Sequence, residues 1–245
     1  MRVQERSSLP PFLSFSACSR DESTLLSDDG LDSRMNEEEF DRREPGPGKS
    51  MASKGAGTSM GDDYSPETIR AAELGDKDAQ LRLSRMYESG IIVERSKEEA
   101  ARWCRKAADQ GDPEAQYRLG IFYYHGVGVE QSFEESAKWS RLAADQGHPG
   151  AQFDIGILYS LGDGVQQSTQ EAENWFLKAA NQGNKLAMFE LGRICEGRAE
   201  DDRAYREAAD WYRKAADRGH ESAKIRLDWM REQGKIKDRS GTDLK

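Results

Sequence analysis

The sequence predicts an all-α fold, a solenoid of 36-residue units in which each unit contributes two helices. Glycines, alanines and tryptophans recur with one period, and helix-capping residues stand at fixed places in each unit. All five Trp and all eight Tyr lie at or after Tyr64, in the part of the chain that repeats. A solenoid unit contacts only its neighbours, so this fold suits a chain with 36% hydrophobic and 33% charged residues.

The 36-residue period holds over four successive units. Four tryptophans, five glycines and five alanines keep the same register along the chain. We interpret the tryptophans as the structural core of the units and expect them to be buried. The periodic positions are Trp103, Trp139, Trp175 and Trp211; Gly75, Gly111, Gly147, Gly183 and Gly219; and Ala79, Ala115, Ala151, Ala187 and Ala223.

The second unit shows why each unit is expected to form two helices. Asp112 suits a helix N-cap, and Gly126 suits the left-handed turn that ends the helix. Ser132 and Glu135 have the spacing of a capping box, which predicts the start of the second helix. Gly120, inside the first helix, indicates a close approach of the two helices, with the tryptophan filling the adjacent space.

The chain divides into three parts. The first part is polar and poor in large apolar residues, so we expect it to be disordered. The repeats follow, and a polar tail that we also expect to be disordered ends the chain. The predicted boundaries are 1–63 for the leader, 64–233 for the solenoid and 234–245 for the tail, with units near 75–110, 111–146, 147–182 and 183–218 and a terminal helix at 219–233.

The fourth unit departs from the pattern. The turn becomes the acidic run Gly197–Asp202, and the cap position is Ala204 in place of Ser. One interpretation is a degenerate unit near the end of the array. The other is a reshaped acidic loop that contacts a partner, because loops carry function more often than scaffolds do.

Four segments of the second unit resemble the Sel1-like repeat (SLR) family, a relative of the tetratricopeptide repeats. The resemblance implies a right-handed α/α solenoid of four units with a partial unit at each end. It further implies a curved scaffold that binds other proteins and shares no catalytic residues. The segments are Gly111–Gly120, Tyr123–Val129, Ala137–Trp139 and Ala143–Gly147.

By analogy with the family, the first helices line the concave side, where positions that vary between units are candidates for recognition. One register would make a groove basic at one end and acidic at the other, which would orient a partner peptide. The alternative is an ordinary solvated helix face. The registers are Arg82, Arg118, Asp154 and Glu190; Arg85, Ile121, Ile157 and Arg193; and Glu88, Tyr124, Ser160 and Glu196. The candidate partner-binding residues are Arg82, Arg85, Arg118, Tyr124, Asp154 and Glu190.

The sequence shows no motif for catalysis, for a cofactor or for a metal. The three histidines have no second His or Cys at metal-ligand spacing. His148 and His220 share the register of Asp112, and we interpret them as exposed turn residues. We therefore predict a noncatalytic, monomeric adaptor that binds a partner protein or peptide, with no catalytic, cofactor-binding or metal-binding residues.

Two alternatives place the protein in a bacterial envelope. One branch of the family has cysteine pairs that staple each repeat and has been linked to penicillin binding or β-lactam hydrolysis; here only Cys104 and Cys195 lie in the repeats. Cys18 leaves open a lipid-anchored periplasmic scaffold. We favour the cytoplasm. A net charge of −9 argues against nucleic acid as a partner, and no apolar run is long enough to span a membrane.

Overall fold

The structure is a computed structural model that describes residues 65–199 and 201–236, so the predicted leader lies outside it. Ten helices and no strand are present in these residues, which confirms the all-α prediction. The helices are α2 (Pro66–Glu73), α3 (Lys77–Ser89), α4 (Lys97–Asp109), α5 (Pro113–His125), α6 (Phe133–Asp145), α7 (Pro149–Leu161), α8 (Thr169–Asn181), α9 (Lys185–Gly197), α10 (Asp202–Ala216) and α11 (Glu221–Glu232).

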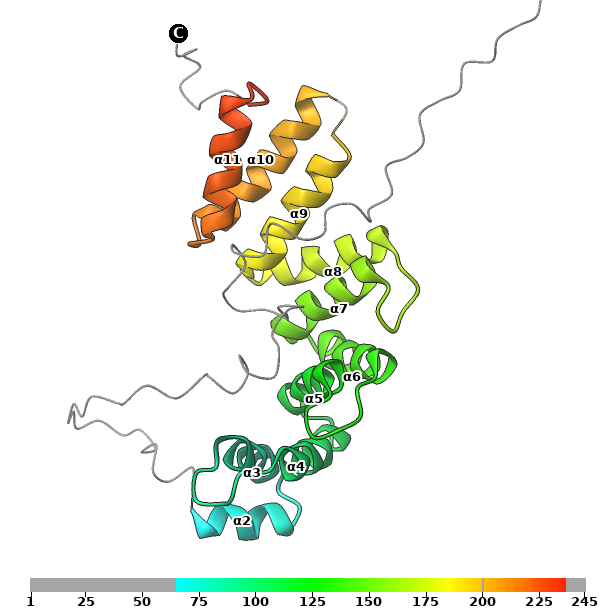
Figure 1. The fold of residues 1–245 in the computed structure, drawn as a ribbon, viewed down its shortest axis with the longest axis vertical. Coiled ribbons are helices and arrows are strands. Elements are labelled where there is room, and N and C mark those ends of the chain that lie inside the picture. The colour runs from blue at the N-terminus through cyan, green and yellow to red at the C-terminus, as the bar shows by residue number, and fades with distance from the viewer. Residues whose placement is uncertain (1–64, 200, 237–245) are drawn as a thin grey trace, which may run out of the picture.

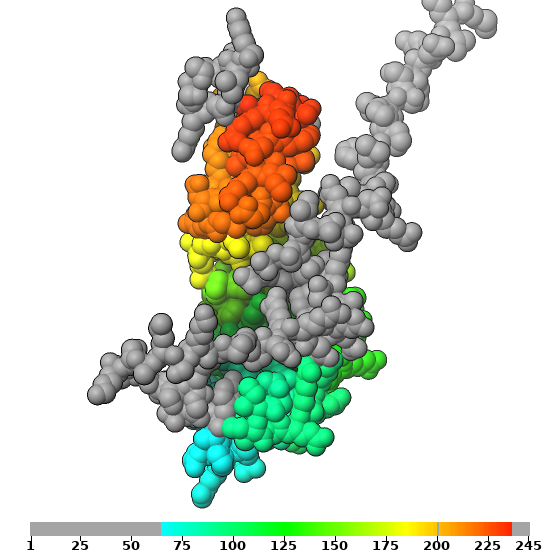
Figure 2. Space-filling model, turned by 60° about the vertical axis from the view of Figure 1, so that its left-hand side comes forward, coloured from blue at the N-terminus to red at the C-terminus, as the bar shows by residue number. Residues whose placement is uncertain are grey.

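The helices form an elongated array in which each helix packs against the helices before and after it in the sequence (Figure 1). Helices α3, α5, α7 and α9 are the first helices of the four units, and α4, α6, α8 and α10 are the second helices. Partial units stand at the two ends, α2 and α11. The buried residues form four clusters along the array, and the space-filling view shows the units following one another in chain order (Figure 2). This distribution of the core is typical of a solenoid.

The first helices and α11 begin at a capping residue whose side chain accepts a backbone N–H of the first turn. At the predicted cap Asp112, Oδ1 accepts from the N–H of Ala115 at 2.8 Å. Gly126 ends this helix with a φ of 71°, a left-handed conformation that glycine adopts without steric cost. The prediction of both helix ends is confirmed. The five caps are Asp76, Asp112, His148, Asn184 and His220.

The second helices α4, α6 and α8 begin at serines, but the predicted capping box is only half formed. Ser132 Oγ accepts from the N–H of Glu135 at 3.2 Å, as expected. The N–H of Ser132 donates to the carbonyl of Tyr123 at 3.0 Å, so it does not need the Glu135 carboxylate. That carboxylate instead accepts from the indole N–H of Trp139 at 3.2 Å. The end of the preceding helix thus supplies the bond that the box would have made.

The glycines inside the first helices lie where the second helix comes closest, as predicted. A Cβ at Gly156 would stand 2.6 Å from the ring of Phe176, and one at Gly192 would stand 2.6 Å from the ring of Tyr212. The prediction that tryptophan fills this space is wrong. The residue that follows each tryptophan fills it, because consecutive helix residues point about 100° apart.

The second helix of the fourth unit is longer than the others. Asp201 caps α10, its Oδ1 accepting from the N–H of Ala204 at 2.9 Å. The predicted cap at Ala204 is therefore wrong, and the helix gains a turn at its N-terminus. After α11, Ile236 is buried in the same cluster as α9 and α10, so the fold extends into the predicted tail. Residues 237–245 of that tail lie outside the described part.

A row of glutamine amides, which the sequence analysis missed, ties three successive helices together. Gln80 at the start of α3 donates from Nε2 to the carbonyl of Ala72 in α2 at 3.1 Å. Its Oε1 accepts from Nε2 of Gln110, at the end of α4, at 2.8 Å. The same amide nitrogen of Gln110 donates to the carbonyl of Gly75 at 3.0 Å.

This arrangement recurs in the next two units and then ends. Each copy has the same three bonds, 36 residues further along the chain. In the fourth unit, Met188 and Arg218 occupy the two glutamine positions, and the guanidinium of Arg218 donates to the carbonyl of Lys214 on its own helix. The recurring pairs are Gln80 with Gln110, Gln116 with Gln146, and Gln152 with Gln182.

Candidate functional site

The candidate partner-binding residues lie on four successive first helices. Helix α3 carries Arg82 and Arg85, α5 carries Arg118 and Tyr124, α7 carries Asp154, and α9 carries Glu190. The structure brings several of them together with residues of neighbouring units, because side chains on adjacent first helices reach across the junction between units.

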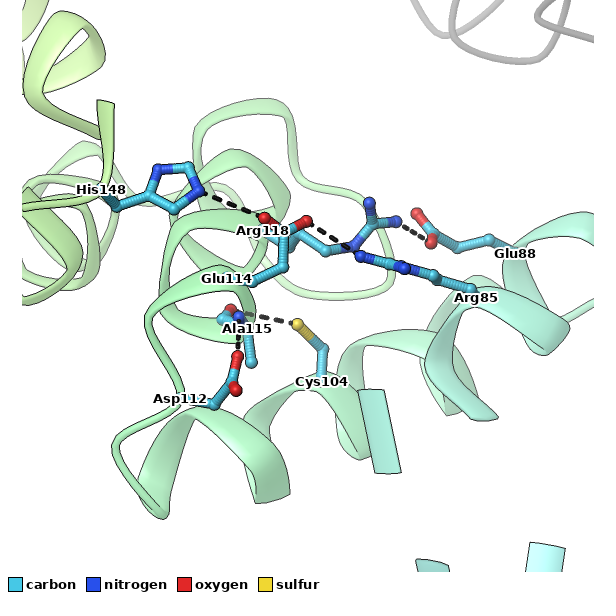
Figure 3. Close-up of polar contacts among 8 residues, drawn as sticks. All are labelled: Arg85, Glu88, Cys104, Asp112, Glu114, Ala115, Arg118 and His148. Atoms are coloured by element: carbon cyan, nitrogen blue, oxygen red, sulfur yellow. Dashed lines mark hydrogen bonds and ion pairs between the residues drawn. The ribbon is translucent and has the colours of Figure 1, made fainter. Parts of the chain in front are cut away.

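A polar network joins the first three units. Glu114 of α5 accepts from the guanidinium of Arg85 at 3.0 Å, and its other carboxylate oxygen lies 3.1 Å from Nε2 of His148. Figure 3 shows Arg85 and His148 reaching Glu114 from two sides. Beside it, Arg118 forms an ion pair with Glu88. The hydrogen bond from His148 is the largest cause that holds the pKa of Glu114 below its usual range.

The same ion-pair register reappears at the other end of the array. Arg226 of α11 contacts both carboxylate oxygens of Glu196, at 2.9 and 2.7 Å. The hydroxyl of Tyr212 also donates to Glu196, at 2.8 Å. Burial and this carboxylate raise the pKa of Tyr212, so its hydroxyl stays a donor. The two end junctions therefore carry neutralised arginines, and Arg118 is not a free charge on the surface.

Between the two ends, the candidate residues are a buried aspartate, a half-buried glutamate and a buried tyrosine. Asp154 is fully buried, and the hydroxyl of Tyr124 lies 3.4 Å from Oδ2 of Asp163. Burial is the largest cause that raises the pKa of Tyr124 to about 12, with a further rise from Asp163. Burial also raises the pKa of Glu190, which lies 3.2 Å from the guanidinium of Arg193. The structure does not place Asp154 where a partner would touch it.

The second variable register lies closer to the surface. Arg85 and Arg193 flank the half-buried Ile121 and Ile157 on successive first helices. Leu161, one turn after Ile157, is 51% exposed. The face of the first helices therefore has an apolar centre between two arginines. Sequence reasoning identified this register but selected only Arg85 from it.

The periodic tryptophans lie on the second helices. Trp103, Trp139 and Trp175 are buried, and Trp211 is half-buried against the last cluster. A lysine three residues later covers three of the four rings, its Nζ lying 3.5 to 3.8 Å from the ring centroid. These contacts contribute cation–π stabilisation and leave the rings inside the scaffold.

The histidines and cysteines are parts of the scaffold. The interpretation of His148 and His220 as exposed turn residues is wrong, because both cap helices and His220 is only 6% exposed. The thiol of Cys104 donates to the carbonyl of Ala115 at 3.3 Å, and burial raises its pKa to about 12. Burial likewise raises the pKa of Cys195 to about 11. Thiols with such pKa values are poor nucleophiles at neutral pH.

Three features of the described residues bear on other classes of function. Both described cysteines are free, so this part of the chain contains no disulfide staple of a repeat. Among the same residues, no three His, Cys, Asp or Glu side chains are grouped as metal ligands. Within this part, each helix is too short or too polar to span a bilayer.

Comparisons with known proteins identify the repeat. The family model described as Sel1 repeat matches residues 77–112, 113–148, 149–184 and 185–220. A solved structure from Escherichia coli, described as a protective antigen present in uropathogenic strains and displaying an SLR fold, is 32% identical with a TM-score of 0.65; the match covers 71% of this chain and 38% of that one. A Sel1 repeat protein from Oxalobacter formigenes is 30% identical with a TM-score of 0.58, covering 67% and 74%. Comparison with curated proteins found no match.

Proposed function

The chain belongs to the Sel1-repeat family, and on that premise we propose that it is a noncatalytic adaptor that binds a partner protein with the face of its first helices. Proteins with these repeats are generally protein–protein interaction scaffolds. The chain spans less than half of the Escherichia coli protein to which it is similar, so this proposal concerns the repeat array itself.

One observation carries the proposal. The periodic glycines and alanines keep their residue type every 36 residues, whereas the register of Arg85, Ile121, Ile157 and Arg193 changes its chemistry while staying near the surface. Helix length does not require this change, because each of the four first helices has 13 residues. The exposed Leu161 enlarges the apolar centre of this face. An apolar centre of this kind favours a partner segment that buries apolar side chains there.

The test compares two exposed leucines that lie on different helices. Leu161 on first helix α7 is 51% exposed and Leu142 on second helix α6 is 41% exposed, so either can become Asp without burying a charge. Leu161→Asp is expected to lower the recovery of a partner by about tenfold or more, as for loss of a central apolar contact. Leu142→Asp is the matched control and should leave recovery unchanged.

Proximity labelling with the full chain, followed by quantitative mass spectrometry, identifies the partner and measures its recovery. Circular dichroism establishes that both variants retain their helix content. If Leu161→Asp and the unaltered chain recover the partner equally, the face of the first helices is not the binding surface. A larger loss with Leu142→Asp would move the binding face to the second helices.

A further inference from the structure

His220 caps the terminal helix through a ring nitrogen that accepts a hydrogen bond only while it carries no proton. Its Nδ1 accepts from the N–H of Ala223, the first-turn bond that an Asp or Asn oxygen makes in three of the four units before it. The ring is 6% exposed and stacks on Phe189 of α9, with centroids 4.4 Å apart. The backbone N–H of His220 donates to the carbonyl of Ala215 in α10 at 3.1 Å. One residue thus connects α9, α10 and α11.

A histidine can act as an N-cap only while it is neutral. Neutral imidazole has one nitrogen that accepts a hydrogen bond, whereas imidazolium has two N–H donors and no acceptor. A proton on Nδ1 therefore breaks the cap and directs an N–H at the N–H of Ala223. It also adds a positive charge to the positive end of the α11 dipole. At Asp76, Asp112 and Asn184 the capping acceptor is a side-chain oxygen in place of a ring nitrogen.

We propose that His220 is an acid-sensitive latch that holds α11 on the end of the array at neutral pH and releases it in mild acid. The cluster shared by the last helices shows what release would uncover. Leu227 and Met230 of α11 pack there with Leu191 of α9 and Tyr212 of α10. Opening the latch therefore exposes apolar side chains at one end of the scaffold.

The charges around His220 agree with this direction. Burial is the largest cause that lowers the pKa of His220, and Lys185 at the start of α9 lowers it further. A hydrogen bond with the backbone of His220, and then Glu221 on the first turn of α11, raise the pKa but more weakly. The unfolded or released histidine thus binds a proton more readily than the docked one. Docking is therefore complete above the unperturbed pKa and weakens as the pH falls below it.

The other histidine cap is an internal control. His148 Nδ1 accepts from the N–H of Ala151 at 3.1 Å, but its Nε2 lies 3.1 Å from a carboxylate oxygen of Glu114. The Glu114 carboxylate therefore gives this ring a charged partner in addition to its cap. Within the described residues, no carboxylate makes a contact of this kind with His220. The same residue type at the same register is therefore expected to respond to acid at one helix only.

Hydrogen–deuterium exchange of the full chain at pH 7.5 and pH 5.5 tests the latch. Protection factors, which remove the intrinsic pH dependence of exchange, are compared for the α11 segment 221–232 and the α7 segment 149–161. His220→Asn and His220→Asp keep a capping oxygen that does not titrate in this range. His148→Asn is the matched control.

At pH 5.5 the unaltered chain should lose about fivefold in α11 protection relative to His220→Asn, the effect of losing one cap. At pH 7.5 the two should agree. His148→Asn should retain the acid-induced loss in α11, and α7 protection should stay constant. The proposal would be overturned if α11 protection in acid fell equally in the unaltered chain and in His220→Asn. It would also be overturned if protection did not fall in the unaltered chain. His220→Asp guards against a loss of folding peculiar to the Asn variant.

Discussion

The first three units and the fourth unit repeat the same helices but hold them together differently. In each of the first three units, a glutamine of the first helix donates to a carbonyl of the preceding helix. It also accepts from the glutamine at the end of the second helix of its own unit. In the fourth, Met188 stands in the first glutamine position and the carboxylate of Glu196 gathers Tyr212 and Arg226. The first three units repeat one glutamine junction, and the fourth unit lacks it. The ion pair of Glu196 with Arg226 has a counterpart between Glu88 and Arg118, but only the last junction adds a tyrosine hydroxyl to it. The array is therefore uniform at its start and specialised at its end.

The core tryptophans offer the strongest test of this difference. Trp139 is buried in the second unit, and Trp211 is half-buried in the fourth. Trp139→Ala is expected to lower the free energy of unfolding by about 3–5 kcal/mol, the usual cost of emptying a large aromatic site. Trp211→Ala should cost clearly less. Urea titrations followed by circular dichroism measure both, and an equal loss would show that the last unit is packed like the others.

The turn glycines are next in expected effect. Gly164 has a φ of 67°, and a Cβ there would stand 2.0 Å from the carbonyl oxygen of Phe133. Gly164→Ala should therefore cost about 3 kcal/mol through backbone displacement and strain. Gly197, where the fourth unit has lost this turn, has nothing within 4 Å, so Gly197→Ala should be close to neutral. Thermal melts of the two variants separate the cases; a stable Gly164→Ala would contradict the close approach.

The glutamine row predicts an intermediate effect. Gln152→Met removes the bond to the carbonyl of Ala144 and leaves Gln182 with one partner fewer, which should cost about 1–2 kcal/mol. Met188→Gln with Arg218→Gln would extend the row into the fourth unit. The double variant should be at least as stable as the unaltered chain in urea titration. A loss of stability on extension would mean that the last unit requires a different spacing of its helices.

The smallest expected effect concerns the helix cap of the fourth unit. Asp201→Ala removes the side chain that accepts from the N–H of Ala204 and should cost about 1 kcal/mol. Ala204→Ser, which restores the serine of the other units, should leave stability nearly unchanged because that position now lies inside α10. The helix content and melting temperature of the two variants measure these effects. A gain in stability from Ala204→Ser would show that the helix cap lies at position 204, as the repeat pattern predicts.

The recurring residues were sufficient to predict the repeat, the helix pairs and most of their ends. Asp112, Gly126 and Ser132 occupy the predicted positions because caps and left-handed turns depend on the chemistry of one residue and its immediate neighbours. The close approach at Gly156 was likewise predictable, since glycine inside a helix needs a packing reason. Which side chain fills that space was not, because it depends on how the second helix is rotated.

The candidate surface was harder to predict than the scaffold. Arg118, Asp154 and Glu190 share a register, so the sequence alone indicated one continuous charged strip. The structure shows an ion pair, a buried carboxylate and a partly buried carboxylate at these three positions. The partner of Arg118 is Glu88, 30 positions away on the neighbouring unit, whereas the partner of Glu190 is Arg193 on the same helix. The register that these three positions share contains no information about such partners.

The amino-acid sequence by itself determined the period, the helix pair in every unit, the caps of the regular units and the family of the repeat. These features are local or periodic, so side-chain size, φ preference and capping chemistry are enough to specify them. Only the tertiary structure decided that Phe176 and Tyr212 face the glycines, that glutamines link successive helices, and that His220 is a buried cap. Those outcomes depend on the rotation and stacking of neighbouring helices, which bring together side chains that lie far apart in the chain.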